Sequence, residues 1–169
     1  ESIKNRNLTK RIGASIYDSS DLKKLPIEKL DLIQIPLSIY NQNLYRNGSI
    51  NYFKNLGISI HVRSIFLQGL LLVDHSQWPL NISKGFKQHH EKFIEFIKKL
   101  GYSPLEVSLA FCKSVDNIEC TLVGVTSKEE LLQIINVWNN NNKNEEIISK
   151  IQYEKWLWPN KNDYDPRYW

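Results

Sequence analysis

The chain has 169 residues, of which 41% are hydrophobic, so it can form a folded core and is not a wholly disordered protein. Its net charge of +4 comes from lysines scattered among glutamates, which indicates a solvated surface rather than a nucleic-acid-binding stripe. No apolar run approaches the roughly 18 residues of a membrane span, and the first residues do not resemble a signal peptide. We therefore expect a cytoplasmic protein that binds neither membranes nor nucleic acid.

Cysteine and histidine usage argues against disulfides and metal sites. Cys112 and Cys120 form no Cys-x-x-Cys pair, so reduced thiols are expected. His89 and His90 are adjacent, and adjacent helical residues point in different directions, so no metal ligand is assigned. The sequence contains no methionine, and we therefore expect a processed product or a fragment of a longer reading frame.

The first part of the sequence alternates apolar segments with polar, turn-rich ones. Segments rich in β-branched and aromatic residues are typical of buried strands, and Asn47-Gly48 indicates a turn. The predicted elements are, in order, a strand at 11–17, a short helix from Ser20 or Asp21 disturbed by Pro26, a strand at 30–38, a helix at 49–57 closed by Gly57, and a strand at 58–64. The loop that follows is unusually apolar for a surface connection.

Three amphipathic helices, one strand and a last helix are predicted after this loop. Two capping boxes, beginning at Ser103 and Ser127, mark the starts of the second and third helices. The stripes predicted to be buried are Phe86, His90, Phe93, Ile97 and Leu100 on the first helix, and Leu131, Ile134, Ile135 and Trp138 on the third. A strand is predicted at 119–124, an asparagine linker at 139–142, and the last helix at 145–158.

Strands that alternate with helices predict an α/β fold with parallel strands joined by right-handed crossovers. Nearly continuous apolar strands indicate a sheet covered on both faces. Only four βα units are present, whereas a complete (β/α)8 barrel takes roughly 250 residues. The pattern alone allows a small doubly wound sheet or half of a (β/α)8 TIM barrel. Either would be one domain, 1–169, with βα units in 1–138 and a linker, extra C-terminal helix and tail in 139–169.

Four ordered segments resemble the aldo-keto reductase superfamily, specifically the C-terminal half of its barrel, strands five to eight. They are TKRIGASIY, DLIQIPLSIYNQNL, GISIHVRSIFLQGLLL and LAFCKSVDNIECTLVGVTSKEEL, and the closing DPRYW is similar to the C-termini of some members. The resemblance favours the half barrel over the doubly wound sheet. It implies a fragment of an NAD(P)H-dependent carbonyl oxidoreductase with a weak or vestigial site for NADP or NAD.

The resemblance implies cofactor contacts at the carboxyl ends of the strands, where barrels place their ligands. The implied cofactor-binding residues are Ser15, Gln34, Arg63, Ser64, Phe66, Gln68, Gly124, Thr126 and Ser127. Ser15 and Gln34 would hold the nicotinamide carboxamide, loop 64–68 would cover the pyrophosphate and ribose, and turn 124–127 would hold the adenosine side. Each also has a plain structural reading: a buried amide bonded to backbone, an apolar loop packed on a helix, and an ordinary capped helix.

Some positions depart from the residues that are usual in the family. Ile16 replaces an Asn that contacts the carboxamide, and Arg63 replaces an aromatic ring that often stacks on the nicotinamide. A guanidinium can lie flat against a ring, but its charge opposes the positive ring of the oxidised cofactor. Glu130 and Ile134 stand where an Arg for the 2′-phosphate and an Asn for adenine are often found. These two changes put a preference for NADP in doubt, although Lys128 is near enough in sequence to compensate in part.

The family's catalytic Tyr, Lys, Asp and His come from the first half of its barrel, so no catalytic residue is assigned and the chain alone is expected to be inactive. A bare apolar inner sheet face and two open edges predict self-association, most simply a homodimer, with the Trp-rich tail 156–169 as an alternative cover. Two other readings stay open. One is a non-enzymatic module whose pairing buries the old cofactor face, and the other is a complementation partner for a chain carrying the first four βα units.

Overall fold

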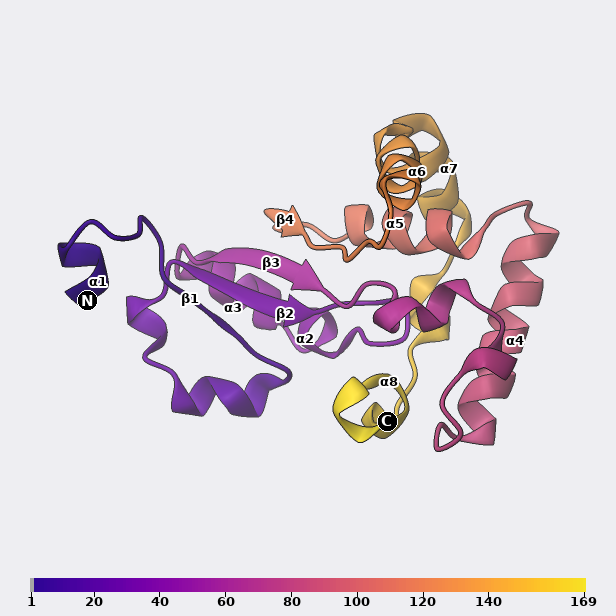
Figure 1. Cartoon of the computed structure of the whole chain (residues 1–169), viewed down its shortest axis with the longest axis horizontal. Helices are drawn as coiled ribbons and strands as arrows, with labels where there is room; N and C mark the ends of the chain where they lie inside the picture. The colour runs from indigo at the N-terminus through magenta and orange to yellow at the C-terminus, as the bar shows by residue number, and fades with distance from the viewer. Residues whose placement is uncertain (1) are drawn as a thin grey trace. The chain divides into compact units, whose positions relative to one another are not determined.

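The computed structural model describes residues 2–169, which form two compact units (Figure 1). The first unit comprises Glu1–Leu37, Gln42–Arg63 and Val115–Leu122 and contains the β-sheet. The second comprises Ser38–Asn41, Ser64–Ser114 and Val123–Trp169 and is helical. No helix of the described residues is both long and apolar enough to cross a membrane.

The sheet of the first unit has its strands in sequential order. They are β1 (Gly13–Ser15), β2 (Leu32–Pro36), β3 (Ser59–Arg63) and β4 (Cys120–Thr121). All three pairings are parallel and the order is β1-β2-β3-β4, which confirms the predicted α/β architecture and rules out a doubly wound order. Each strand is shorter than predicted, most of all β4, where a six-residue segment contributes two residues to the ladder.

Short helices flank these strands. They are α1 (Ser2–Asn5), η1 (Ser19–Lys24), η2 (Ile27–Lys29), α2 (Asn43–Arg46) and α3 (Ser49–Asn55). The helix expected to begin at Ser20 or Asp21 is a 3-10 helix capped by Asp18, whose carboxylate accepts from the Ser20 N–H at 2.9 Å. Gly57 closes α3 as predicted, with the left-handed φ of 72° that glycine adopts at little cost.

The two faces of the sheet differ in polarity, so the prediction of an apolar inner face was wrong. Side chains alternate along a strand. One face carries Ile33, Ile35, Ile60 and Val62, each no more than 1% exposed. The opposite face carries residues that are half-buried or exposed: Gly13, Ser15, Leu32, Gln34, Ser59, His61 and Arg63. The run LDLIQIP was read as a nearly continuous apolar strand, yet its alternation sends the isoleucines to one face and Gln34 to the other.

An ion pair joins the two edges of this sheet. The guanidinium of Arg11, just before β1, contacts both carboxylate oxygens of Glu119, just before β4, at 2.9 and 3.0 Å. Neighbouring strands lie about 4.8 Å apart, so flat edges would be roughly 14 Å apart. Across a flat sheet the two side chains could meet only if both were fully extended, so the pair favours a curled sheet. Four sequential parallel strands curled in this way form half of a (β/α)8 barrel.

The second unit contains the longer helices. Its elements are η3 (Leu67–Leu72), η4 (His75–Gln77), α4 (Lys84–Lys99), α5 (Pro104–Ser114), α6 (Lys128–Asn139), α7 (Asn141–Lys150), η5 (Tyr153–Trp156), α8 (Lys161–Tyr164) and η6 (Pro166–Tyr168). The capping box that starts α5 is confirmed, because Ser103 N–H donates to Glu106 at 2.8 Å and Glu106 N–H donates back to the Ser103 hydroxyl at 3.3 Å.

The stripe on α4 is confirmed except at its end. Phe86, His90, Phe93 and Ile97 are buried, whereas Leu100 follows the last helical residue and is 36% exposed. The stripe predicted on α6 was wrong. Leu131 and Ile135 are 40% and 41% exposed, and no α6 residue is buried. Helices α5 and α7 contact α6 but cover only part of its apolar surface.

The asparagine run is not a linker. Asn140 accepts from the Lys143 N–H at 3.2 Å and caps α7, which starts at Asn141, because asparagine is among the best N-cap residues. The helix predicted at 145–158 ends at Lys150, and the chain continues into η5, where Tyr153 packs on Phe111 with ring centroids 4.9 Å apart.

An aromatic cluster fills the second unit. Tyr40 is fully buried at its centre, and its hydroxyl lies 2.8 Å from Nδ1 of His90. Each of the other rings of the cluster packs on Tyr40 or on another member, and these rings are Phe86, His89, His90, Phe93, Trp78, Trp156 and Trp158. Burial lowers the pKa of His90 to about 4, so its imidazole is neutral at pH 7. The Trp-rich tail thus contributes two indoles to this core.

Candidate functional site

Three of the residues singled out from the sequence meet at the carboxyl ends of the strands. Ser15 and Gln34 are paired in register on β1 and β2, and the Ser15 hydroxyl donates to the Gln34 side-chain oxygen at 3.2 Å. Arg63 ends β3, and its Nε donates to the Ser15 hydroxyl oxygen at 3.2 Å. We call Ser15, Gln34 and Arg63 the strand-end cluster.

Arg63 is held in place by two further contacts. Its Nη2 donates to the backbone oxygen of Ile16 at 3.2 Å, and its guanidinium carbon lies 4.3 Å from the centre of the Tyr17 ring. Tyr17 was not selected from the sequence, although strand alternation places it on the same side as Ser15, two residues earlier. The contacts orient a positive, ring-stacked group beside the Ser15 hydroxyl.

The strand-end cluster combines donors, acceptors and one fixed cation. The Ser15 hydroxyl and the Gln34 amide can each donate and accept, which complements a carboxamide. Ile16, which replaces the family's Asn, is 1% exposed and offers no side-chain contact on this face. The cluster therefore suits an uncharged amide and disfavours a cationic ring, because Arg63 already carries a positive charge there.

The apolar loop after β3 packs into the core of the second unit. Ile65, Leu67, Leu70 and Leu71 are buried, and η3 contacts α5. Phe66, implied as a cofactor contact, is also buried at 8% exposure. The packing reading of this loop thus accounts for its apolar character.

The polar residues of the loop remain accessible and adopt a rare backbone conformation. Ser64 and Gln68 have φ angles of 59° and 55°, in the left-handed region. Such angles cost non-glycine residues about 1–2 kcal/mol each and are frequent at ligand sites. Gln68 is exposed and Ser64 is half-buried.

The turn before α6 already holds a carboxylate. Ser127 caps α6 by accepting from the Glu130 N–H at 3.1 Å. Glu130 in turn accepts from the Thr126 N–H at 2.7 Å and from the Thr126 hydroxyl at 3.0 Å, and these hydrogen bonds lower the pKa of Glu130. A Cβ on Gly124 would meet no atom within 4 Å, so space is open there. An incoming phosphate would have to displace Glu130.

A second polar cluster lies on the inner face, at the amino ends of the strands, and sequence reasoning did not find it. It contains Arg11, Ser59, His61 and Glu119. Arg11 holds the pKa of Glu119 at about 2 through its hydrogen bonds and charge. Nε2 of His61 is buried without a hydrogen-bond partner among residues 2–169, and it lies 3.7 Å from Glu119. Alternation along β3, with Ser59, His61 and Arg63 at every second position, was the signal available.

The chain belongs to the class of (β/α)8-barrel proteins and forms half of such a barrel. Three features define this class: parallel strands in sequential order, polar groups at their carboxyl ends, and a capped helix after the last strand. The chain matches the model of the Aldo/keto reductase family over residues 1–153 and belongs to that family. The family generally uses NAD(P)H. No curated protein matches the chain.

Two solved structures show the same fold. One is the aldo-keto reductase AKR11C1 from Bacillus halodurans in its apo form, with a TM-score of 0.65 and 16% identity. The other is the thermostable aldo-keto reductase Tm1743 in complex with the inhibitor epalrestat, with a TM-score of 0.51 and 17% identity. Each alignment covers 88% of this chain but only 53% and 51% of the other chain. The chain therefore spans about half the length of these reductases.

Proposed function

We propose that this chain is the C-terminal barrel half of an NAD(P)H-dependent carbonyl oxidoreductase and that it keeps a dinucleotide site. The observation that carries the proposal is the strand-end cluster, in which Ser15, Gln34 and Arg63 from three strands converge. Barrels bind their ligands at the carboxyl ends of their parallel strands, where polar groups gather. The free thiols Cys112 and Cys120 are compatible with the reducing cytoplasm that we expect for it.

The residues present fit one end of the cofactor and not the other. Ser15 and Gln34 offer the donor and acceptor that a nicotinamide carboxamide needs. A bound reduced nicotinamide would supply a hydride to a carbonyl. This chain's own residues bind and orient, and we assign none of them a proton-transfer role.

We further propose that the turn before α6, considered by itself, favours NAD(H) over NADP(H). Glu130 occupies both Thr126 donors, and its carboxylate would repel a 2′-phosphate while accepting a hydrogen bond from a free ribose hydroxyl. Lys128 is exposed at the start of α6 and offsets this repulsion only in part.

Calorimetric titration with NADH and NADPH tests the proposal. We expect saturable NADH binding that Gln34→Ala weakens several-fold by removing a hydrogen bond, whereas Gln88→Ala, a change of the same type on α4, leaves it unchanged. Glu130→Gln should reduce the difference in affinity between NADPH and NADH. Absence of saturable binding by either nucleotide at millimolar concentration would overturn the proposal.

We propose that the isolated chain does not reduce carbonyls. The catalytic acid and its partners are implied for the other half of the barrel. Without an aligned acid, a bound cofactor reduces a carbonyl only slowly. An assay of NADH consumption with aldehydes and ketones should show no turnover above the buffer rate. Turnover that persists in the Gln34→Ala, Arg63→Gln double variant would also contradict the proposed site.

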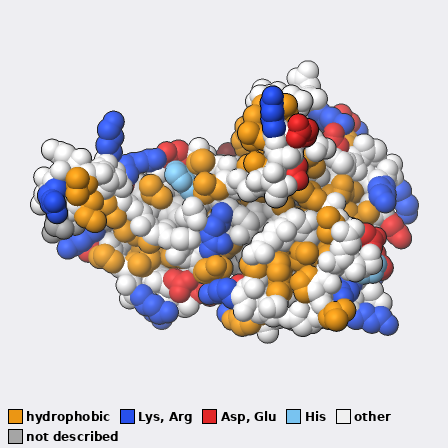
Figure 2. All heavy atoms as spheres, viewed as in Figure 1, with side chains coloured by type: hydrophobic (Ala, Val, Ile, Leu, Met, Phe, Trp, Pro, Cys, Tyr) orange, Lys and Arg blue, Asp and Glu red, His pale blue; other side chains and the backbone are white. Residues whose placement is uncertain are grey.

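A second candidate function is a self-associating, non-enzymatic module. Its support is the apolar face of α6, where Leu131, Leu132 and Ile135 are 40–47% exposed and hydrophobic side chains reach the surface (Figure 2). A homodimer through this face would fall apart in Leu132→Glu but not in Leu80→Glu, since Leu80 is 97% exposed elsewhere. Sedimentation equilibrium measures this, and a monomer at tens of micromolar would exclude the dimer.

A further inference from the structure

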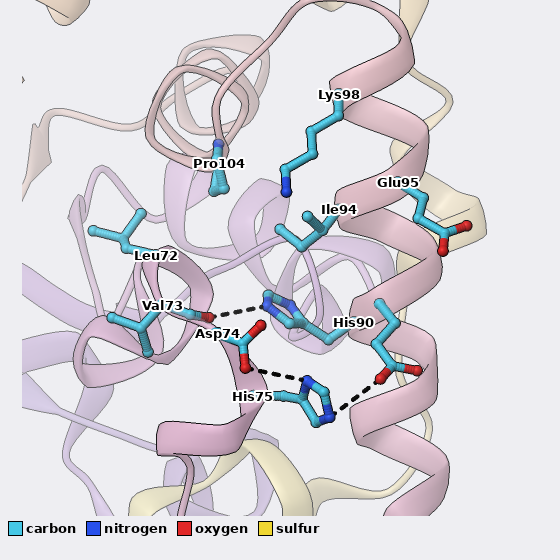
Figure 3. A pocket seen from close by; sticks show the side chains of 10 residues that line it. Leu72, Val73, Asp74, His75, His90, Ile94, Glu95, Lys98 and Pro104 are labelled. Atoms are coloured by element: carbon cyan, nitrogen blue, oxygen red, sulfur yellow. Dashed lines mark hydrogen bonds and ion pairs between the residues drawn. The ribbon is translucent and has the colours of Figure 1, made fainter.

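A pocket of about 560 Å³ lies in the second unit between residues 72–75 and helix α4 (Figure 3). Small organic ligands occupy pockets of roughly 300–1,000 Å³. None of the residues implied in cofactor binding lines it. The pocket is therefore a separate cavity from the strand-end cluster.

Apolar side chains and His90 line the middle of the pocket. Leu72, Val73, Ile94 and Pro104 form the walls. His90 forms the floor, where Nε2 lies 3.3 Å from the Val73 oxygen and Nδ1 lies 2.8 Å from the Tyr40 hydroxyl. Both imidazole nitrogens are thus used within the protein, and the ring serves as a fixed surface instead of a reactive group.

One end of the pocket carries two carboxylates. Nε2 of His75 lies 3.1 Å from Glu91, and Nδ1 of the same ring lies 3.7 Å from Asp74 (Figure 3). His75 thereby lies within ion-pair distance of both acids. No group of three or more His, Cys, Asp or Glu in residues 2–169 has the arrangement of a metal site, so the acids are not explained as cation ligands of that kind.

The other end carries Lys98. Its ammonium turns toward Ile94 and Pro104, into the pocket, whereas the carboxylate of Glu95 points away (Figure 3). A Glu–Lys pair at this spacing commonly forms on a helix, but the Glu95 carboxylate does not face the Lys98 ammonium, and the Lys98 side chain is exposed. Glu91 and Lys98 are seven residues apart, which places them about 10 Å apart along one side of α4.

We propose that this pocket binds a small zwitterion whose charges are separated by an apolar spacer, such as an ω-amino acid or a short apolar peptide with free termini. The ligand's ammonium would meet Asp74 and Glu91, its carboxylate would meet Lys98, and its hydrocarbon would lie on Ile94 and Leu72. Asp74, Glu91 and Lys98 are exposed, so water solvates them when no ligand is bound, and selectivity comes from matching of charge. A simple anion would face the two acids and a simple cation would face Lys98, whereas a bipolar ligand meets an opposite charge at each end.

Titration of the full chain with 6-aminohexanoate, hexanoate and hexylamine, followed by amide NMR shifts, tests the proposal. We expect shifts confined to residues 72–75 and 90–98, with 6-aminohexanoate binding about threefold to fivefold more tightly than either singly charged analogue. Lys98→Gln should reduce its affinity to that of hexylamine, and Glu91→Gln to that of hexanoate. Lys99→Gln, an equal charge change on the adjacent exposed residue, should have no effect.

Three results would overturn the proposal: shifts scattered over the surface, equal affinity for the three probes, or equal effects of Lys98→Gln and Lys99→Gln. Ile94→Trp gives an independent check, since filling the cavity should abolish the shifts while leaving the amide spectrum of the aromatic cluster folded. All titrations are run without dinucleotide. Failure here therefore leaves the proposed cofactor site untouched, and failure of NADH binding leaves this pocket untouched.

Discussion

The two units bury their side chains in different ways. The second is held by an aromatic cluster in which Tyr40, Phe86 and Phe93 are fully buried. The first buries isoleucines on one face of a four-stranded sheet and presents polar side chains on the other. The comparison teaches that a half barrel need not expose an apolar inner wall, because strand alternation can make that wall polar.

This contrast changes the expectation for self-association. A polar inner face gains little from pairing with an identical copy, since it offers little apolar area to bury and Arg11 is already paired with Glu119. Exposed apolar surface lies on α6 of the second unit instead. Three predictions test how far the two units differ in what stabilises them, and a fourth tests the ligand preference of the polar face.

Truncating the aromatic cluster should have the largest effect. Phe93→Ala removes a fully buried ring that packs on Tyr40 and Trp156, and should lower the free energy of unfolding by about 3–5 kcal/mol. Phe96→Ala, on a half-buried ring of the same helix, should cost less, and Gln34→Ala on the inner face about 0.5 kcal/mol or less. Urea denaturation measures all three, and an equal loss in Gln34→Ala would refute the contrast.

Acid should weaken the second unit through His90. The folded pKa of His90 is about 4, below its ordinary 6.5, so between these values the unfolded chain binds a proton that the folded chain does not. Stability should fall as pH drops from about 6.5 to about 4, by up to roughly 3 kcal/mol, and this contribution should level off below that. His90→Gln should flatten this slope, whereas His75→Gln should retain it. Denaturation midpoints at several pH values decide the matter.

In the first unit, the most sensitive position is a close approach between strands. A Cβ at Gly13 would lie 2.5 Å from the Leu32 side chain and 2.6 Å from its carbonyl oxygen, and the backbone oxygen cannot move without breaking the ladder. Gly13→Ala should cost about 1–3 kcal/mol. Gly124→Ala, where space is open, is the matched control, and thermal denaturation should separate the two.

The smallest effect concerns the charge of the strand-end cluster. Arg63 should favour the uncharged reduced nicotinamide over the positive oxidised ring, by about 1 kcal/mol or roughly fivefold at a partly exposed site. Arg63→Gln should remove this preference while Arg46→Gln should keep it. Equal binding of NADH and NAD⁺ by the unaltered chain would show that Arg63 does not face the ring.

Much of the fold was predictable because local signals and global order agreed. The capping box at Ser103 and the α4 stripe from Phe86 to Ile97 are set by short-range chemistry, and the parallel order follows from alternating strands and helices. The exposure of Leu131 was not predictable, since periodicity shows which side of a helix is apolar but not whether another element covers it.

The candidate site was predictable in outline for the same reason. Ser15, Gln34 and Arg63 end three strands, and parallel strand ends share one edge of a sheet. The engagement of Thr126 by Glu130 could not be foreseen, because it depends on a side-chain rotamer and not on spacing alone. Tyr17 and His61 were missed because the strands were read as nearly continuous apolar segments, and that reading hides the alternation that places both residues.

The bond between Arg11 and Glu119 has a consequence for biosynthesis. During translation β1, β2 and β3 can pair as each leaves the ribosome, but the clasp between the sheet's two edges must wait until 108 further residues have been added after Arg11. Until then the nascent sheet lacks the ion pair that joins its two edges. The edge of β3 also stays open to pairing with strands of other chains.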